Sequence, residues 1–247
     1  MDVKSCGFSD KPLLCDWWLR GHWKRNNNDG SSDALYCSAV GRYHSEHSGG
    51  CAQKNRWRSV VLGVHPGPGE SLKITTIKSY IKRKHIFRKK IHDIVLLKLP
   101  EGTQAPATID PADCNAKPKL GDVVQIAGHA STHMDVDIQS PTLQCVNVYV
   151  VDCTELRKIE SRSNTGYEHQ HWFCGQATGR DIRGGDSGGG VVFNGRLYGL
   201  IAFSVNATRA GEDAIGFLDL CHPDYLQWIE TTIATPKRKK CSGFFCG

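Results

Sequence analysis

The chain has 247 residues, a net charge of +6 and 39% hydrophobic residues. A chain of this length can bury about 70–75% of its unfolded surface, which suits one large all-β domain or two small ones. Its apolar runs are shorter than the roughly 20 residues that a transmembrane helix needs, so we expect no membrane span.

Eleven cysteines are scattered along the chain without paired C-x-x-C motifs. This pattern favours a disulfide framework over a metal site, and the odd number leaves at least one thiol unpaired. We therefore expect a secreted or extracellular protein with neither a metal nor an organic cofactor. The N-terminal sequence MDVKSCGFSDKPLLCDWW has no apolar core typical of a signal peptide. Because the cysteines and this N-terminus disagree, we expect an incomplete or atypical N-terminus.

The first 34 residues differ from the rest of the chain and are predicted to form an atypical, poorly ordered segment. Residues Lys24–Asp33 are polar, rich in turn formers and without periodicity, which predicts a loop or disorder. From about Arg58 the chain contains short β-rich runs separated by turns such as HPGPGE and FNGR, as expected for a β-barrel or sandwich. The predicted strands are 59–64, 72–78, 93–99, 122–128, 142–152, 189–193 and 196–203.

One helix is predicted near the C-terminus, in HPDYLQWIETTI, with Pro223 in its first turn. Tyr225, Ile229 and Ile233 lie on one face of this helix and should contact the core. Residues 236–247 form a basic tail, in which Cys241 and Cys246 can close a small loop.

Two stretches carry much of the positive charge, Ile81–Lys90 and Pro236–Lys240. A functional interpretation is a surface for heparin-like or nucleic-acid polyanions. A solvated face and a charged tail explain the same residues without any ligand, and we favour that explanation. We expect no specific binding of nucleic acid.

The most informative stretch is GRDIRGGDSGGG, which places six glycines around one Asp-Ser pair. Glycine permits positive φ angles and leaves the backbone N–H groups unshielded. The hydroxyl of Ser187 and the amides of Gly185 and Ser187 can then face one point. A nucleophile beside two hydrogen-bond donors is the arrangement that acyl transfer requires.

Together with HDIVLLKLP at His92–Pro100, this stretch resembles the chymotrypsin-like (S1) serine proteases, such as trypsins and granzymes. The GDSGG and D-I-x-L-L-K-L motifs occur here in the order typical of that family. The resemblance covers residues 35–235, a predicted protease domain. It implies an all-β fold of two six-stranded antiparallel barrels with a C-terminal helix. The implied activity is that of a serine endopeptidase acting on protein or peptide substrates, with protease inhibitors as further partners.

The resemblance also implies roles for individual residues. Ser187 matches the nucleophile, and Asp93 matches the aspartate that orients the catalytic histidine. The amides of Gly185 and Ser187 match the oxyanion hole. Asp186 matches the aspartate that pairs with the new N-terminal amine of mature family members, although this chain has no I-V-G-G-like string.

The same resemblance implies a set of disulfide bonds. Its pairs are Cys37–Cys51, Cys153–Cys174 and Cys114–Cys221, with Cys145 bonded to Cys6 or Cys15. A further bridge of the family is missing, because Arg183 occupies the position of its first cysteine.

The catalytic base is where the chain departs from the family. Family members have the catalytic histidine directly before the cysteine that matches Cys51, whereas this chain has Gly50. Glycine cannot accept a proton, and a serine without a base is a weak nucleophile. Our candidate is His47, with His44 as the alternative, but we favour the explanation that both are surface-loop histidines.

Two further histidines are weaker candidates for the base. His22 lies too far upstream of Cys51. His92 directly precedes Asp93 and should point to the opposite face of the strand.

Three residues are predicted to contact the substrate. Asp181 lies six residues before Ser187, at the base of the family's primary pocket, where a carboxylate favours Arg or Lys at the cleaved bond. Ile215 stands where trypsin-like members have a glycine, and would narrow the pocket. Ser204 ends the string IAFS, which replaces the family's S-W-G.

Two functions therefore remain in competition. The first is a serine endopeptidase. The second is a catalytically inactive homologue that acts as a binding module, which Gly50 favours. A third, polyanion binding through Lys82–Lys90, depends on charge alone.

Overall fold

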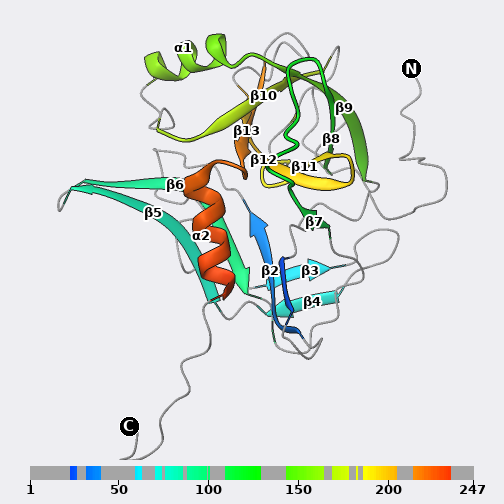
Figure 1. The fold of residues 1–247 in the computed structure, drawn as a ribbon, viewed down its shortest axis with the longest axis vertical. Coiled ribbons are helices and arrows are strands. Elements are labelled where there is room, and N and C mark those ends of the chain that lie inside the picture. Colours follow the sequence, from blue (N-terminus) through cyan, green and yellow to red (C-terminus); the bar gives the residue numbers. More distant parts are fainter. Residues whose placement is uncertain are drawn as a thin grey trace, which may run out of the picture.

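The computed structural model describes part of the chain. The described residues are 23–26, 32–39, 59–62, 70–73, 76–85, 88–98, 100, 109–128, 143–163, 169–177, 182, 186–204 and 214–234. They form a mostly β protein with two helices, in which the C-terminal half lies above the N-terminal half in the view of Figure 1.

The C-terminal half contains a closed antiparallel barrel of six strands. In spatial order the strands are β11 (Gly190–Phe193), β8 (Val123–Gly128), β9 (Gln144–Val151), β10 (Trp172–Gln176), β13 (Ile215–Asp219) and β12 (Arg196–Ser204). The barrel closes because β11 pairs with both β8 and β12. A short strand, β7 (Asp110–Pro111), joins β12 in parallel.

The apolar runs of the barrel strands are explained by burial on two faces. Successive side chains of a strand point to opposite sides of the sheet. On β12, Ile201 contributes to the cluster inside the barrel, whereas Leu200 and Ala202 contribute to a second cluster outside it. The hairpin between β11 and β12 turns at Asn194 and Gly195, whose φ angles of 47° and 73° fit the type I′ turn that an Asn-Gly pair favours.

The N-terminal half contains six strands in two sheets within the described residues. One sheet has the order β1 (Trp23–Asn26), β2 (Ser32–Ala39), β6 (Arg88–Lys98) and β5 (Thr76–His85). The other pairs β3 (Ser59–Leu62) with β4 (Glu70–Lys73). All of these strand pairs are antiparallel.

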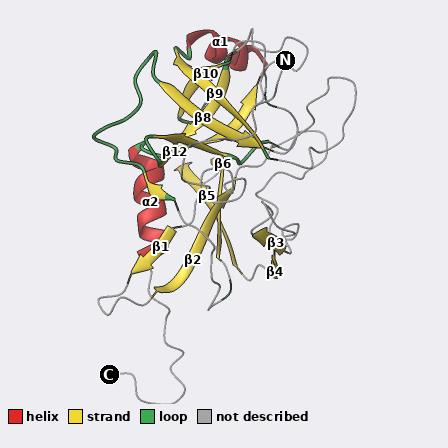
Figure 2. Cartoon of the chain, turned by 90° about the vertical axis from the view of Figure 1, so that its right-hand side faces the viewer, coloured by secondary structure: helices red, strands yellow, loops and turns green. Residues whose placement is uncertain are grey.

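The C-terminal helix α2 (Pro223–Ala234) joins the two halves. It lies beside the sheet that contains β5 and β6 (Figures 1 and 2). Tyr225 and Ile229 are fully buried in the outer cluster together with Ile94 and Leu96 of β6. The predicted helix, its proline and its apolar face are therefore confirmed.

A second helix, α1 (Thr154–Ser163), was not predicted. Its sequence TELRKIESRS is mostly polar and has no clear apolar stripe, but Leu156 is buried in the outer cluster. Asp152 accepts a hydrogen bond from the Thr154 amide at 2.7 Å and satisfies an N–H group where the helix begins. Neither described helix is long and apolar enough to cross a membrane.

Two further predictions from sequence are wrong. Residues Lys24–Asp33 are not a loop throughout, because β1 covers its beginning and β2 its end. The predicted strand 72–78 is not one strand, because β4 ends at Lys73 and β5 begins at Thr76. In both places pairing with a neighbouring strand has overridden the local sequence pattern: β1 pairs with β2, whereas β4 and β5 pair with different partners in different sheets.

Candidate active site

Ser187 lies in a tight turn formed by residues 186–189. The Gly189 amide donates a hydrogen bond to the Asp186 carbonyl at 3.0 Å, and Gly188 has a φ of +93°. A turn with a positive φ at its third residue is of type II, which requires glycine there. The glycine after the serine is therefore a conformational requirement of the turn.

The turn is attached to the barrel by two backbone hydrogen bonds with Ile201 of β12. The Gly188 amide donates to the Ile201 carbonyl, and the Ile201 amide donates to the Gly189 carbonyl, both at 2.8 Å. Ile201 is buried, whereas Ser187 is partly exposed. The serine is thus presented at the surface of a rigid support, as a nucleophile must be.

Close packing also fixes the turn from the side of β8. The Asp186 carboxylate lies so near the Cα atom of Gly128 that any side chain there would collide with it. At Gly189 an added Cβ would lie 2.9 Å from the Ala127 carbonyl oxygen. These two glycines permit the turn to approach β8 closely.

Asp93, the predicted orienting aspartate, lies on β6 and is 7% exposed. Its backbone N–H donates to the side-chain carbonyl of Gln170 at 3.2 Å. Ile94, the next residue, is fully buried in the outer cluster. Asp93 is therefore a carboxylate on a firmly packed strand of the N-terminal half, whereas Ser187 belongs to the barrel of the C-terminal half.

His92 is bound to the C-terminal helix. Its Nδ1 atom lies 2.8 Å from the Tyr225 hydroxyl, and its ring meets that of His169 edge-on at 4.8 Å. The Tyr225 hydroxyl also accepts a hydrogen bond from the His171 amide at 3.3 Å. These contacts give His92 a structural role and agree with its exclusion as the base.

The residues of the predicted pocket are placed in part. Ile215 is 1% exposed, and on β13 it pairs in register with Ser204 of β12. Ile182, the neighbour of Asp181, is buried in the same cluster as Ile215. The pocket role of Ile215, Ser204 and Asp181 stays a prediction, since Asp181 lies outside the described residues.

The predicted base also lies outside the described residues. The same holds for the following positions discussed above: His22, His44, His47, Gly50, Cys51, Asp181, Arg183 and Gly185. The structure therefore describes Ser187 and Asp93, whose catalytic roles stay predictions, as do the base and the Gly185 amide.

Two of the predicted disulfide bonds are confirmed. Cys153 is bonded to Cys174 and Cys114 to Cys221, each with Cα atoms 5.4 Å apart. Cys145 is also disulfide-bonded, and the identity of its partner stays a prediction. The Cys37–Cys51 bridge lies outside the part of the chain whose side chains are described.

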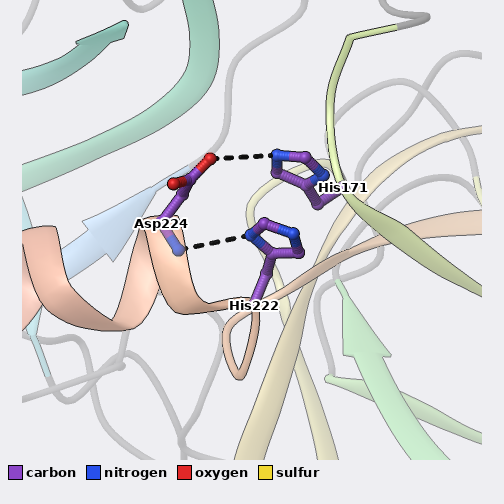
Figure 3. Close-up of side chains that lie close together, drawn as sticks. All are labelled: His171, His222 and Asp224. Atoms are coloured by element: carbon purple, nitrogen blue, oxygen red, sulfur yellow. Dashed lines mark hydrogen bonds and ion pairs between the residues drawn. The ribbon is translucent and has the colours of Figure 1, made fainter.

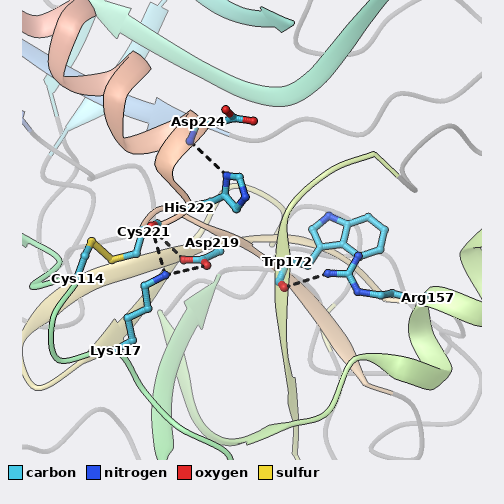
Figure 4. A network of polar contacts seen from close by, with 8 residues as sticks. All are labelled: Cys114, Lys117, Arg157, Trp172, Asp219, Cys221, His222 and Asp224. Carbon is cyan, nitrogen blue, oxygen red and sulfur yellow. Dashed lines mark hydrogen bonds and ion pairs between the residues drawn. A yellow bond between two sulfur atoms is a disulfide. The ribbon is translucent and has the colours of Figure 1, made fainter. Parts of the chain in front are cut away.

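The Cys114–Cys221 bridge is surrounded by polar contacts at the start of α2 (Figure 4). The Lys117 ammonium lies 3.3 Å from both the Asp219 carboxylate and the Cys221 carbonyl. Asp219 in turn accepts a hydrogen bond from the Cys221 amide at 2.9 Å. Together these contacts fix the chain directly before His222.

A second polar contact fixes the chain after His171. The guanidinium of Arg157 lies over the ring of Trp172, 5.2 Å from its centroid, and donates to the Trp172 carbonyl at 3.3 Å. Such a stacked arginine adds a cation–π attraction to its hydrogen bond. It ties α1 to the start of β10 (Figure 4).

The sequence did not indicate a cluster of His171, His222 and Asp224 (Figure 3). The two imidazoles are stacked with centroids 3.4 Å apart and an interplanar angle of 2°. The His171 Nε2 atom lies 3.4 Å from a carboxylate oxygen of Asp224. The cluster forms because β10 pairs with β13, placing the residue before β10 near the turn after β13. Neither strand was predicted, so the sequence offered no usable signal.

Asp152, at the start of α1, has a clearly shifted pKa. The side-chain and backbone hydrogen bonds from Thr154 lower the pKa of Asp152 below its ordinary value, with a smaller contribution from the Arg157 charge. Hydrogen bonds to the ionised form stabilise it in this way. The shift belongs to the start of α1 and not to the serine turn.

Comparisons with known proteins relate the chain to proteases. A sequence profile of the family described as Trypsin matches residues 48–229. The snake venom serine protease BITS01A of Bothrops insularis is 24% identical over 197 residues, covering 75% of this chain and 73% of that protein.

The solved structures that are similar in fold include the following two. The scabies mite inactivated protease paralogue S-D1 has a TM-score of 0.61 at 19% identity, covering 81% of this chain and 84% of the other. Neuropsin, a serine protease expressed in the limbic system of mouse brain, has a TM-score of 0.59 at 18% identity, covering 88% of this chain and 95% of the other. These likenesses confirm the predicted fold class.

Proposed function

Because the chain belongs to the trypsin family, we propose that it is a serine endopeptidase with Ser187 as its nucleophile. The observation that carries this proposal is the turn of residues 186–189. In this turn Ser187 is partly exposed, and two backbone hydrogen bonds, at Gly188 and Gly189, attach the turn to the buried Ile201 of β12. A glycine-rich turn without a catalytic role would not need a serine presented in this way.

The proposed reaction is acyl transfer to Ser187 followed by hydrolysis. The Ser187 Oγ atom attacks the carbonyl carbon of the peptide while a histidine accepts its proton. The N–H groups of Gly185 and Ser187 donate to the oxygen that becomes negatively charged. The C–N bond then breaks, the leaving amine takes the proton from the histidine, and water hydrolyses the acyl-enzyme.

Asp93 is proposed to orient the histidine and to stabilise its protonated form. A buried carboxylate on a rigid strand suits this role, since a fixed acceptor selects one tautomer of the ring. We propose His47 as the histidine, with His44 as the alternative. Both follow β2 in the chain and precede Cys51.

The proposed specificity is cleavage after Arg or Lys. Asp181 would supply the negative charge at the base of the pocket. Support comes from the burial of its neighbour Ile182 in the cluster that contains Ile215. Ile215 has a large side chain where a trypsin-like pocket has glycine, so we expect weaker binding of long cationic side chains.

Hydrolysis of fluorogenic peptides by the oxidised, full-length chain tests these roles. Peptides with Arg, Lys, Leu or Asp before the cleaved bond are compared. Ser187→Ala should abolish hydrolysis, and Asp181→Asn should remove any preference for Arg and Lys. His47→Ala and His44→Ala identify the base by which of them loses activity. Ser161→Ala, on the exposed side of α1, is the matched control and should leave the rate unchanged.

A second candidate function is that of an inactive protease homologue that binds a partner, which Gly50 favours. The related scabies mite structure is itself described as an inactivated protease paralogue. If the folded, disulfide-bonded chain hydrolyses none of the peptides, this second candidate replaces the first. Either function fits our proposal of a secreted protein that meets protein substrates or protease inhibitors.

A binding function would have a candidate surface on the β5–β6 hairpin. The register of the two strands pairs Lys82 with Lys90 and Arg83 with Lys89. Like charges directly opposite each other destabilise a hairpin, so these pairs favour an anionic partner. Retention on heparin that decreases with salt, and is lost on changing these four residues to Glu, would support this surface. Equal retention of the variant would exclude it.

A further inference from the structure

We propose that His171, His222 and Asp224 form a zinc-binding site at the start of α2. Each residue offers one ligand atom, and these atoms all lie within 4.8 Å of one another. The three residues come from two segments of the chain, the approach to β10 and the first turn of α2. The inference does not depend on the proposed peptidase activity.

The composition of the cluster matches zinc. Zinc is bound by imidazole nitrogens and carboxylate oxygens, and a set of two histidines and one acidic residue leaves a fourth position for water or another ligand. Calcium and magnesium prefer six or more oxygen ligands, which this cluster does not offer. All three side chains are partly exposed, so an ion can reach them.

One pair of ligand atoms already has the spacing of a tetrahedral site. With zinc–nitrogen and zinc–oxygen distances of about 2.0–2.2 Å, neighbouring ligand atoms lie about 3.4 Å apart. The His171 Nε2 atom and the Asp224 carboxylate oxygen already have a separation of 3.4 Å. In Figure 3 the His171 Nε2 atom faces the Asp224 carboxylate, whereas the His222 Nδ1 atom accepts a hydrogen bond from the Asp224 backbone N–H at 3.3 Å, which a bond to a shared ion at this atom would replace. Because the rings are parallel, one of them must rotate before both nitrogens point at a shared ion.

The backbone of the site is held firmly, so only side chains need to move. The His171 carbonyl accepts a hydrogen bond from the Asp219 amide at 3.0 Å. The His222 carbonyl accepts hydrogen bonds from the Tyr225 and Leu226 amides, both at 3.0 Å. His222 also follows Cys221, which is bonded to Cys114.

An ion at this position would connect elements that surround Asp93. The Tyr225 hydroxyl, next to Asp224 in the chain, contacts both His92 and the His171 amide. Gln170, next to His171, accepts a hydrogen bond from the Asp93 amide. Zinc would therefore link α2 to the segment before β10 and stabilise the surroundings of the predicted catalytic aspartate.

The test is zinc titration of the oxidised, full-length chain after removal of metal with EDTA. Free thiols are first alkylated, since the odd number of cysteines leaves a competing zinc ligand. Calorimetry should show one tight zinc site per chain, and zinc should raise the melting temperature because it binds the folded state. Magnesium and calcium should give neither effect.

Variants assign the site. His222→Gln and Asp224→Asn should each weaken zinc binding on the order of 100-fold, since even the loss of an outer hydrogen-bond partner of a ligand costs about 10–100-fold. His85→Gln, at the far end of the β5–β6 hairpin, removes a histidine elsewhere and should leave binding unchanged. Circular dichroism without zinc checks that each variant is folded. Zinc binding of equal strength in all variants, or none in the folded wild type, would overturn the proposal.

Discussion

Ser187 and Asp93 are positioned by contacts of different range in the sequence. The serine turn closes on itself between Asp186 and Gly189, and its nearest support, Ile201, belongs to the adjacent hairpin. Asp93 instead depends on Gln170, 77 residues away, and its neighbour His92 contacts Tyr225, 133 residues away. The comparison shows that the hydrogen bonds of the serine turn are local, although the turn also packs against β8, whereas the hydrogen bonds around Asp93 join parts of the chain far apart in sequence.

The largest effect is expected from Gly188→Val. A β-branched residue is strongly disfavoured at the φ of +93° found there, at a cost of about 1–2 kcal/mol. The changed backbone would turn the Ser187 hydroxyl away from the proposed oxyanion-hole amides. We expect peptide hydrolysis to fall at least 100-fold. Gly195→Val is the matched control, because Gly195 also has a positive φ but lies in the turn of the β11–β12 hairpin. It should lose similar stability and keep its activity; equal losses of activity would contradict a special role for the serine turn.

Gly128→Ala should have the next largest effect. The new methyl group would collide with the carboxylate of Asp186, the first residue of the serine turn. Overpacking of this kind costs about 1–3 kcal/mol. We expect a fall of roughly 10–100-fold in kcat, measured with the best peptide of the series, because a displaced turn would misorient the Ser187 hydroxyl relative to the peptide carbonyl. An unchanged kcat would show that the turn does not depend on its packing against β8.

Tyr225→Phe tests the long-range side of the comparison. It removes the hydroxyl that contacts His92 and the His171 amide, and a buried polar group left without its partner costs about 1–3 kcal/mol. Urea unfolding should show this loss. Tyr149→Phe, whose side chain is 55% exposed, should leave stability within error of the wild type. If the two variants are equally stable, the contacts of the Tyr225 hydroxyl do not stabilise the surroundings of Asp93.

Asp152→Asn should have the smallest effect. The folded state lowers the pKa of Asp152, so the unfolded state binds more protons and the ionised carboxylate stabilises the fold. This contribution is present above the ordinary pKa of 3.8 and is lost as the pH falls through the lower folded value. The variant should therefore melt slightly below the wild type at pH 6 and match it near pH 2. A difference that grows on acidification would contradict the direction of the shift.

The contrast also explains which features could be predicted from sequence. The serine turn, the apolar face of α2 and the disulfide bonds Cys153–Cys174 and Cys114–Cys221 follow from local motifs or from the family resemblance. The surroundings of Asp93 could not be predicted, because they depend on the pairing of β10 with β13 and on α2. Residues such as His171 and His222 have no pattern of their own until that pairing exists. Helix α1 was missed for a different reason, because its sequence is mostly polar and has no clear apolar stripe.

Reaction with a fluorophosphonate probe, located by mass spectrometry, tests the central claim most directly, because it requires no knowledge of the natural substrate. An activated serine oxygen attacks the phosphorus atom and displaces fluoride. We predict one adduct, on Ser187, in the oxidised wild-type chain, and none in Ser187→Ala or in unfolded protein. A folded, correctly bridged chain that carries no adduct, or an adduct on another residue, would contradict the assignment of Ser187 as an activated nucleophile.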